Sequence, residues 1–221
     1  MKIFLTGATG FIGSALIPEL IAAGHQVLGL TRSESGARVL AAAGAVSHLG
    51  DLRDIDSLRR CAKVSDAVIH CAYSHDFSKP DDIGRMEAGA IETLGNELAG
   101  TDRPLVITSV TGMGAETPGQ PATEGGYNPR NPRSTTEQAC QAIRERGANV
   151  SIVRLAQVHN HIKQGLVSAL VDIARAKGVS AYIGDGSNRW SAVHLLDAVT
   201  LYRLALEKAK PGSVLLIFTE N

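Results

Sequence analysis

The glycine-rich segment Lys2–Gly13 (KIFLTGATGFIG) constrains the fold more than any other stretch of the chain. A short apolar run typical of a buried strand leads into three glycines, and an apolar stretch typical of a helix follows. In this order the glycines permit a tight turn, a close approach of backbone amides to a pyrophosphate, and close packing of the helix on the strand. We therefore expect a dinucleotide at the helix N-terminus, contacted by Gly7, Thr9, Gly10, Phe11, Ile12 and Gly13.

Segments with the patterns of strands and helices alternate along nearly the whole chain. The expected strands are Lys2–Leu5, Gln26–Leu30, Ala67–Cys71, Leu105–Ser109, Val150–Leu155 and Val214–Phe218. The expected helices are Phe11–Ala23, Ser35–Ala42, Ile55–Cys61, Ile83–Leu98, Ser134–Arg146, Gln164–Lys177 and Leu195–Lys208. Three glycines stand where helix C-caps usually fall, namely Gly24, Gly44 and Gly147. Continuous apolar strands between helices predict an α/β fold of the doubly wound Rossmann type, a parallel sheet with helices on both faces. We expect one domain over residues 1–221, in which residues 164–194 form a reduced C-terminal substrate lobe.

The charge balance and the cysteines narrow the class of protein. The chain has 22 basic and 22 acidic residues, with no basic stripe, so neither nucleic acid nor an anionic membrane is an expected partner. Cys61, Cys71 and Cys140 are odd in number, widely spaced and without paired metal-ligand spacing, which is typical of reduced thiols and predicts no metal site. The glycine motif leaves no room for a signal peptide, and no apolar run is long enough to span a membrane. We expect a cytoplasmic protein.

The end of the second strand, HQVLGLTRS, bears on the choice of dinucleotide. Folds that prefer NAD place an acidic side chain near here to hold the ribose 2′-hydroxyl. No carboxylate occurs between Gln26 and Ser33, and Arg32 and Ser33 stand there instead. A guanidinium fits a phosphate and keeps its charge, so this end predicts NADP(H) in preference to NAD(H). An exposed arginine on a turn is the alternative interpretation.

Three motifs together resemble the short-chain dehydrogenase/reductase superfamily. They are TGATGFIG, Asp51-Leu52 after a third strand, and HCAY at the end of the fourth. The resemblance is to the extended and atypical branch, which contains NAD-dependent epimerases, dehydratases and 3-beta-hydroxysteroid dehydrogenase-like enzymes. It implies that Asp51 and Leu52 flank the adenine, and that the ribose and phosphates lie against Cys71, Ala72 and Tyr73. It also implies that Thr108 lies under the nicotinamide side, and that the carboxamide is contacted by Ala156, Gln157 and Val158. In SAVHLLDA the pair His194 and Asp197 resembles a structural turn at a helix start.

The catalytic residues of that superfamily are a serine or threonine and a Tyr-x-x-x-Lys pair on a helix. In ITSVTGMG, Ser109 matches the serine that orients the substrate oxygen, and Thr111 matches a second polar position. The tyrosine–lysine pair is missing, because Arg133 and Glu137 in RSTTE stand at its two positions. These two form either a simple ion pair on one helix face or a site in which Glu137 is a base.

Other residues are candidates for the proton transfer. Tyr127 lies in the glycine- and proline-rich loop 112–132, which is either a mobile loop over a substrate or a solvated connector. His159 follows the carboxamide segment and titrates in a suitable range, whereas His159 and His161 alone are weak evidence for a metal. His75 and Asp76 fall where the family places residues near the substrate.

Together these features favour an NADP(H)-dependent oxidoreductase acting on a carbonyl or alcohol of a small apolar molecule. A homodimer, in which a second subunit closes an open cleft, is an expected form. Two other classes stay open: a non-redox isomerase, lyase or cyclase on the same fold, and a nucleotide-sensing regulatory protein.

Overall fold

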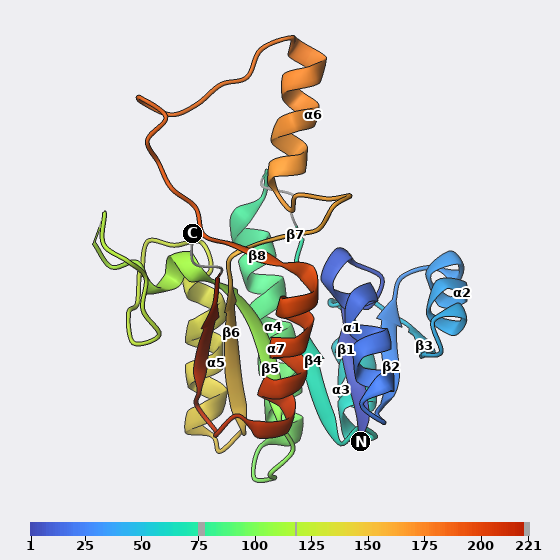
Figure 1. Cartoon of the computed structure of the whole chain (residues 1–221). Coiled ribbons are helices and arrows are strands. Elements are labelled where there is room, and N and C mark those ends of the chain that lie inside the picture. Colours follow the sequence, from blue (N-terminus) through green and yellow to red (C-terminus); the bar gives the residue numbers. More distant parts are fainter. Residues whose placement is uncertain (75–77, 118, 219–221) are drawn as a thin grey trace.

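A seven-stranded parallel sheet forms the centre of the computed structural model, which describes residues 1–74, 78–117 and 119–218 (Figure 1). The strands are β1 (Lys2–Thr6), β2 (Gln26–Thr31), β3 (Val46–Leu49), β4 (Ala67–His70), β5 (Leu105–Val110), β6 (Val150–Leu155) and β9 (Val214–Ile217). Their order across the sheet is β3-β2-β1-β4-β5-β6-β9, with every neighbouring pair parallel. The strand order reverses between β1 and β4, and ligands of such sheets bind at the carboxyl ends of the strands at this switch point.

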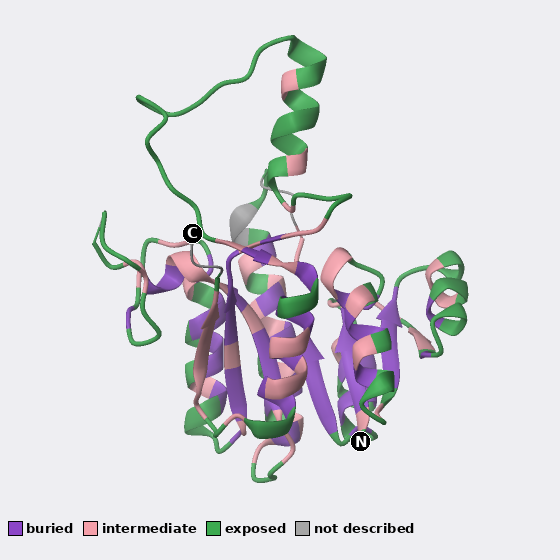
Figure 2. Ribbon diagram, in the orientation of Figure 1, coloured by how far each residue is buried: buried purple, intermediate pink, exposed green. Residues whose placement is uncertain are grey.

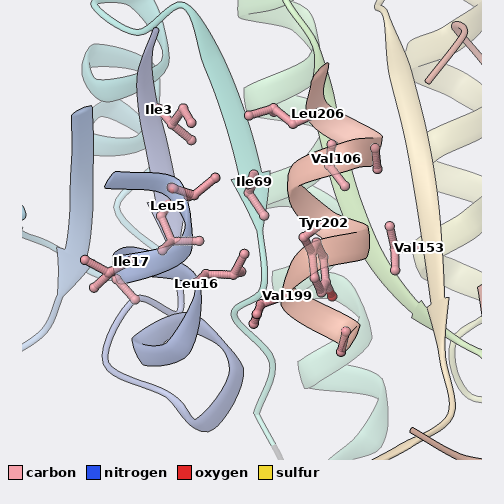
Figure 3. Packing of buried hydrophobic residues seen from close by; sticks show 14 of the residues in the cluster. Ile3, Leu5, Leu16, Ile17, Ile69, Val106, Val153, Val199, Tyr202 and Leu206 are labelled. Carbon is pink, nitrogen blue, oxygen red and sulfur yellow. The ribbon is translucent and has the colours of Figure 1, made fainter. Parts of the chain in front are cut away.

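Helices cover both faces of the sheet, as the sequence predicts. Their bounds are α1 (Phe11–Ala22), α2 (Glu34–Ala42), α3 (Ile55–Lys63), α4 (Pro80–Leu98), α5 (Ser134–Glu145) and α7 (Leu195–Lys208). Alternate residues of β1 point to opposite faces: Ile3 and Leu5 pack with α1 and α7, whereas Phe4 packs with α3 and α4. Figure 3 shows the first of these two cores, and Figure 2 shows that buried residues follow the strands and the inner helix faces. The Rossmann-type prediction is confirmed.

Three glycines end helices at the expected positions. Gly24, Gly44 and Gly147 have φ angles of 84°, 83° and 87°, directly after the C-caps of α1, α2 and α5. Only glycine adopts this left-handed conformation without steric cost, and it turns the chain back toward the next strand. The expected boundaries therefore hold to within a residue or two at these three ends.

The structure also contains strands that have no expected range. The residues of β3 are exposed or half-buried, so β3 lacks the continuous apolar run by which the other strands are predicted. Two three-residue strands, β7 (Gln157–His159) and β8 (Ala192–His194), form a separate parallel pair in which Val158 faces Val193. A 3₁₀-helix, Thr111–Gly114, follows β5.

The segment between β7 and β8 projects from the carboxyl ends of the strands (Figure 1). It contains α6 (Val167–Lys177), in which every residue is exposed or half-buried (Figure 2). Large apolar side chains stay open to solvent, such as Leu170 in the helix and Trp190 after it, 65% and 71% exposed. The role of residues 164–194 in substrate binding stays a prediction. Within the described residues, no helix has the length and the apolar character needed to cross a bilayer.

Candidate functional site

The glycine turn after β1 presents an uncapped helix N-terminus at the switch point. Gly7 has a φ of 69°, and its carbonyl oxygen accepts a hydrogen bond from the Gly10 amide at 2.9 Å. Gly10 is the N-cap of α1 and has no side chain to satisfy the first-turn amides, and that turn carries no acidic residue. Such amides, with the positive end of the helix dipole, form a site for an anion. The turn therefore fits the pyrophosphate of a dinucleotide.

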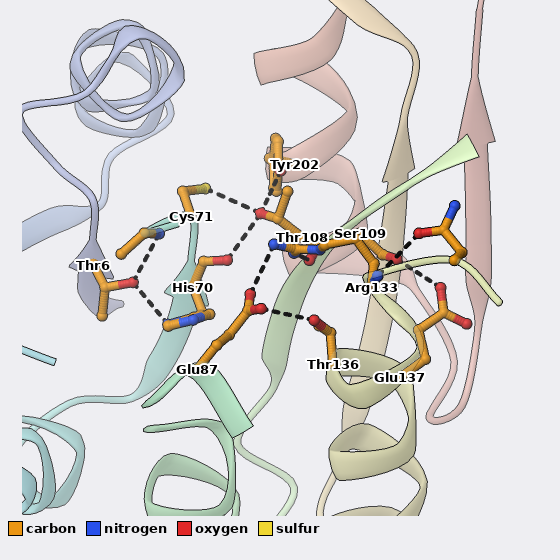
Figure 4. A network of polar contacts seen from close by, with 12 residues as sticks. Thr6, His70, Cys71, Glu87, Thr108, Ser109, Arg133, Thr136, Glu137 and Tyr202 are labelled. Carbon is orange, nitrogen blue, oxygen red and sulfur yellow. Dashed lines mark hydrogen bonds and ion pairs between the residues drawn. The ribbon is translucent and has the colours of Figure 1, made fainter. Parts of the chain in front are cut away.

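The ends of β1 and β4 are packed tightly against each other. A Cβ added at Gly7 would lie 2.7 Å from the Ala72 nitrogen and 2.8 Å from the Cys71 carbonyl carbon. Thr6 links the two strands, because its hydroxyl accepts a hydrogen bond from the Ala72 amide and lies 2.9 Å from Nδ1 of His70 (Figure 4). Cys71 and Ala72 therefore lie beside the turn, where the family resemblance expects the cofactor, and Tyr73 follows them in the chain.

The end of β2 brings the residues expected at the adenosine together. The Gly50 amide donates to the carbonyl of Thr31, so the segment before Asp51 runs beside the end of β2. Arg32 is exposed, while the Ser33 hydroxyl caps α2 by accepting from the Gly36 amide at 3.1 Å. Asp51 is half-buried and accepts a hydrogen bond from the backbone of Arg53, and Leu52 packs on the core.

Lys163 is a candidate that sequence reasoning missed. Its ammonium lies 5.3 Å from the centroid of the Phe11 ring, and Phe11 is the first residue of α1. The backbone of Lys163 is held by the Asn160 side chain at 2.8 Å. This contact places a cation beside the glycine turn from a loop distant in sequence. Because no spacing rule links residues so far apart, the only signal was a basic residue after the carboxamide segment.

Neighbouring residues of β5 point to opposite faces of the sheet. The Thr108 hydroxyl donates to the His70 carbonyl at 2.8 Å and lies 2.6 Å from the Tyr202 hydroxyl of α7. The Ser109 hydroxyl is fully buried on the other face and donates to Oε1 of Glu137 at 2.7 Å (Figure 4). The expectation that Ser109 orients a substrate oxygen therefore meets a physical obstacle, since its hydroxyl is already bonded inside the core.

Arg133 and Glu137 form two separate buried ion pairs. Nη1 of Arg133 lies 3.0 Å from Oε1 of Glu87 on α4, and Nη2 donates to the Thr108 carbonyl. Glu137 binds Arg154 of β6 through both carboxylate oxygens, at 2.9 Å and 2.7 Å. The simple ion pair on one helix face is wrong, because Arg133 is the N-cap residue of α5 and precedes the helix. Glu137 is buried and accepts hydrogen bonds from Arg154 on both carboxylate oxygens, so a role as a base stays a prediction.

Burial shifts the pKa values of two groups in this network. Burial raises the pKa of Glu87 above its usual value, although Arg133 and the Thr136 hydroxyl act in the opposite direction. Burial, together with the nearby charge of Arg133, lowers the pKa of His70 to about 3. His70 is therefore neutral near pH 7, with its Nδ1 beside the Thr6 hydroxyl.

His70 gives a prediction on acid stability. Its folded pKa of about 3 is below the unfolded value of about 6.5. Between these values the unfolded chain binds the extra proton, so His70 contributes stability that is present above pH 6.5 and lost as pH falls toward 3. We expect His70→Asn to flatten this fall, by about 1.4 kcal/mol per pH unit, in urea unfolding followed from pH 7 to pH 4. His161→Asn, at an exposed histidine, should keep the wild-type slope. Equal slopes in all three proteins would contradict the assignment.

The remaining candidates lie in two places. The Tyr127 hydroxyl accepts from Nε2 of Gln138 at 3.1 Å, and its ring lines a pocket between α5 and the strands β6 and β9. Thr111 lies 3.3 Å from the Ser191 hydroxyl just before β8, at the carboxyl end of the sheet. His75 and Asp76 lie outside the described residues.

The carboxamide segment and the histidines meet at β7 and β8. Ala156 and Val158 are buried, and the Gln157 amide donates to the Ser191 carbonyl at 2.9 Å. The rings of His159 and His194 meet edge to face at 5.8 Å. His194 is the N-cap of α7, with Nδ1 accepting from the Leu196 amide, and Asp197 lies in the first turn, so this pair stabilises the helix start.

The loop 112–132 is anchored to the buried ion pairs. Nη1 of Arg154 donates to the carbonyls of Thr123 and Glu124 at 2.9 Å and 3.1 Å. The Asn128 amide donates to the carbonyl of Met113 at 2.8 Å. The middle of the loop is therefore tied to β6, and its role over a substrate stays a prediction.

Comparison with known proteins finds a family model, related sequences and a solved structure that each match nearly the whole chain. The model of the NAD dependent epimerase/dehydratase family matches residues 3–217. An uncharacterized protein of Schizosaccharomyces pombe is 44% identical over 97% of this chain and 73% of its own length. The decarboxylating sterol-4-alpha-carboxylate 3-dehydrogenase of Dictyostelium discoideum is 29% identical over 94% of this chain and 68% of its own. In fold, the chain is similar to the dTDP-glucose 4,6-dehydratase DesIV from Streptomyces venezuelae, solved as a double mutant with NAD. The TM-score is 0.80 and the identity 21%, and the match covers 98% of this chain and 75% of DesIV.

Proposed function

Since the chain belongs to the NAD dependent epimerase/dehydratase family, within the short-chain dehydrogenase/reductase superfamily, we propose that it is an NADP(H)-dependent oxidoreductase. Its substrate is a carbonyl or alcohol of a small apolar molecule. The observation that carries the proposal is the uncapped N-terminus of α1, which follows the glycine turn at the switch point. Family membership supports an NAD(P)-dependent enzyme, and the choice of NADP and of the substrate class is ours.

The residues of this chain would hold the dinucleotide along the carboxyl ends of the strands. The amides of the glycine turn take the pyrophosphate, and Lys163 adds a positive charge beside it. Asp51 and Leu52 flank the adenine, and residues 156–158 contact the carboxamide. When bound, the dinucleotide supplies or accepts a hydride. The protein then has to orient the substrate oxygen and to move one proton.

Two observations support an apolar substrate. The sterol dehydrogenase of Dictyostelium discoideum is a relative whose name specifies a sterol carboxylate. In addition, the segment 164–194 projects beyond the carboxyl ends of the strands (Figure 1). Its exposed apolar side chains include Ile183 and Trp190. A small polar sugar would gain little from such a surface, whereas an apolar ring system would bury it.

A non-redox isomerase, lyase or cyclase is the second candidate. Its specific support is that Arg133 and Glu137, at the two positions of the usual tyrosine and lysine, are both committed to buried ion pairs. An enzyme that keeps the cofactor-binding fold but lacks the tyrosine of the Tyr-x-x-x-Lys pair can catalyse a reaction other than hydride transfer. A nucleotide-sensing regulatory protein would instead bind the dinucleotide and a protein partner without turnover.

One experiment separates these functions. NADPH is titrated into the purified protein by fluorescence, and the loss of NADPH absorbance is then followed with a panel of apolar ketones and aldehydes. An oxidoreductase is expected to bind NADPH and to oxidise it only in the presence of a carbonyl. Tight binding without turnover on the whole panel would overturn the oxidoreductase and leave the other two classes.

The choice of NADP gives a prediction at Arg32. Arg32→Ala is expected to weaken NADPH binding by about 10- to 100-fold, the range of a lost charged hydrogen bond, and to leave NADH binding within about 2-fold. The guanidinium is exposed at the end of β2, where a 2′-phosphate would reach it. Arg60→Ala is the matched control, because Arg60 is exposed in the last turn of α3, whose C-terminus leads to the amino end of β4. Equal losses for NADPH and NADH would contradict the 2′-phosphate contact.

A further inference from the structure

The oxidoreductase proposed above needs a group that moves a proton, and the phenols of the chain are in four different settings. Tyr202 is fully buried, and burial raises its pKa well above the usual value. Tyr127 is bonded to Gln138 beside α5, and Tyr182 is 74% exposed in the loop after α6. Tyr73 is different, because it follows Cys71 and Ala72, the two residues after β4 that lie against the glycine turn.

A guanidinium lies against the ring of Tyr73. Cζ of Arg133 is 4.1 Å from the ring centroid, within the range of a cation–π contact. Arg133 itself is held by two partners from different elements, the Glu87 carboxylate of α4 and the Thr108 carbonyl of β5. Its side chain is only 8% exposed. A cation fixed from two sides therefore fixes the position of the aromatic ring that it covers.

The other acid–base groups described near this point are committed elsewhere. Ser109 and Glu137 are bonded to each other, and Glu137 also to Arg154, in the core. His70 is fully buried and stays neutral. Tyr73 is half-buried, and the residues just before it lie against the glycine turn, where the dinucleotide would bind.

We propose that Tyr73 is the residue that transfers the proton in the oxidoreductase reaction, and that Arg133 is its positioning residue. The inference rests on the proposed function. In reduction, the carbonyl carbon accepts the hydride, with its two electrons, that NADPH supplies. The carbonyl oxygen accepts the phenolic proton of Tyr73, which leaves an alcohol and NADP⁺. The Tyr73 phenolate then regains a proton from water, and oxidation of an alcohol runs these steps in reverse.

The position of Arg133 gives this pair a physical basis. In the usual superfamily site the tyrosine stands where Arg133 stands here. In this chain the phenol comes from β4 instead, and the cation comes from the N-cap of α5. The phenol therefore comes from a different element than in the usual site, and it still lies beside a positive charge.

The first test compares Tyr73→Phe with Tyr127→Phe, the same chemical change at a second phenol. Reduction of a ketone that the wild type accepts is measured from pH 5 to pH 10 with NADPH. We expect Tyr73→Phe to lower kcat by about 10²- to 10⁴-fold, the usual range for a general acid, and to remove the fall in kcat at high pH. Binding of NADPH should change by less than about 3-fold. Full activity in Tyr73→Phe, or a loss of this size in Tyr127→Phe alone, would overturn the inference while leaving the oxidoreductase intact.

The positioning role is tested at Arg133. Arg133→Lys keeps a cation but not the planar group, and Arg133→Met keeps only the length of the side chain. We expect kcat to fall in the order wild type, Arg133→Lys, Arg133→Met, with KM for the ketone nearly constant. A uniform loss of kcat that follows the loss of thermal stability would indicate a purely structural arginine and overturn the role.

A second readout does not depend on turnover. Fluorotyrosine is incorporated at all four tyrosines, and the Tyr73 resonance is assigned by its absence in Tyr73→Phe. We expect NADPH to shift the Tyr73 resonance and to leave that of Tyr127 in place. If the Tyr73 resonance does not shift when NADPH is added, the inference is overturned, whatever reductase activity the protein has. A wild type that is inactive on every carbonyl overturns the proposed function, and this inference with it.

Discussion

Replacing Arg154 by methionine is expected to lower the free energy of unfolding by about 3–5 kcal/mol, the range measured when one partner of a buried ion pair is removed. Arg154 and Glu137 are 3% and 6% exposed, and their two hydrogen bonds of 2.9 Å and 2.7 Å close a bidentate pair. Without the guanidinium, the carboxylate would keep only the hydrogen bond from Ser109. A buried carboxylate without its cation costs more free energy than the intact ion pair or an uncharged side chain in the same place.

Urea unfolding at pH 7 measures this effect, with Arg59→Met as the matched control. Arg59 pairs with Asp56 at 2.7 Å on the surface, with its side chain 54% exposed. Exposed pairs contribute little, so this control should cost less than about 1 kcal/mol. The double variant Glu137→Gln/Arg154→Met should recover part of the loss, because no buried charge is left behind. If Arg154→Met cost no more than Arg59→Met, the pair would not be buried in solution.

The loop 112–132 gives the same variant a local consequence. Arg154 also holds the carbonyls of Thr123 and Glu124, so its removal should free the middle of the loop before the whole protein unfolds. Limited proteolysis of Arg154→Met should therefore cut the loop faster than it cuts the wild type. The buried pair thus connects the stability of the core to the order of a loop at the carboxyl end of the sheet.

The fold could be predicted because its signals are local. Continuous apolar runs mark the central strands, and the glycines after α1, α2 and α5 mark the helix ends. β3 was expected only as a third strand before Asp51, without a range, because its residues are exposed or half-buried at the sheet edge and lack an apolar run. The strands β7 and β8 were not predicted, because three residues are too few to show a periodic pattern.

The site was less predictable because its pairings are not local. The spacing of Arg133 and Glu137 predicts a shared helix face, but the helix begins one residue after Arg133. Each side chain instead binds a partner from another element, which no spacing rule specifies. One signal was present: Glu87 interrupts the apolar stripe of α4 that contains Ile83 and Ile91, and a carboxylate on a buried stripe requires a cation opposite it.

The largest effect on the cofactor site is expected from Gly13→Ala. A Cβ at Gly13 would overlap the carbonyl oxygen of Gly7 and lie 2.8 Å from its carbonyl carbon and 2.9 Å from Cα of Ala8. All three atoms belong to the backbone of the turn, so α1 would have to move away from β1 and take its N-terminal amides with it. We expect a loss of about 3 kcal/mol in the free energy of unfolding, the upper end for an overpacked core, and NADPH binding weaker by at least about 100-fold.

Gly89→Ala is the matched control, because it makes the same change at another helical glycine. A Cβ at Gly89 in α4 meets no atom of the described structure within 4 Å. Alanine is the better helix former by up to about 1 kcal/mol, so this variant should be as stable as the wild type or more stable, with unchanged NADPH binding. If the free energy of unfolding falls in Gly13→Ala and rises in Gly89→Ala, the loss is caused by the clash with the glycine turn and not by the loss of glycine flexibility. If Gly13→Ala behaved like Gly89→Ala in both measurements, the close packing of α1 on the glycine turn would be wrong, and with it the cradle on which the dinucleotide site depends.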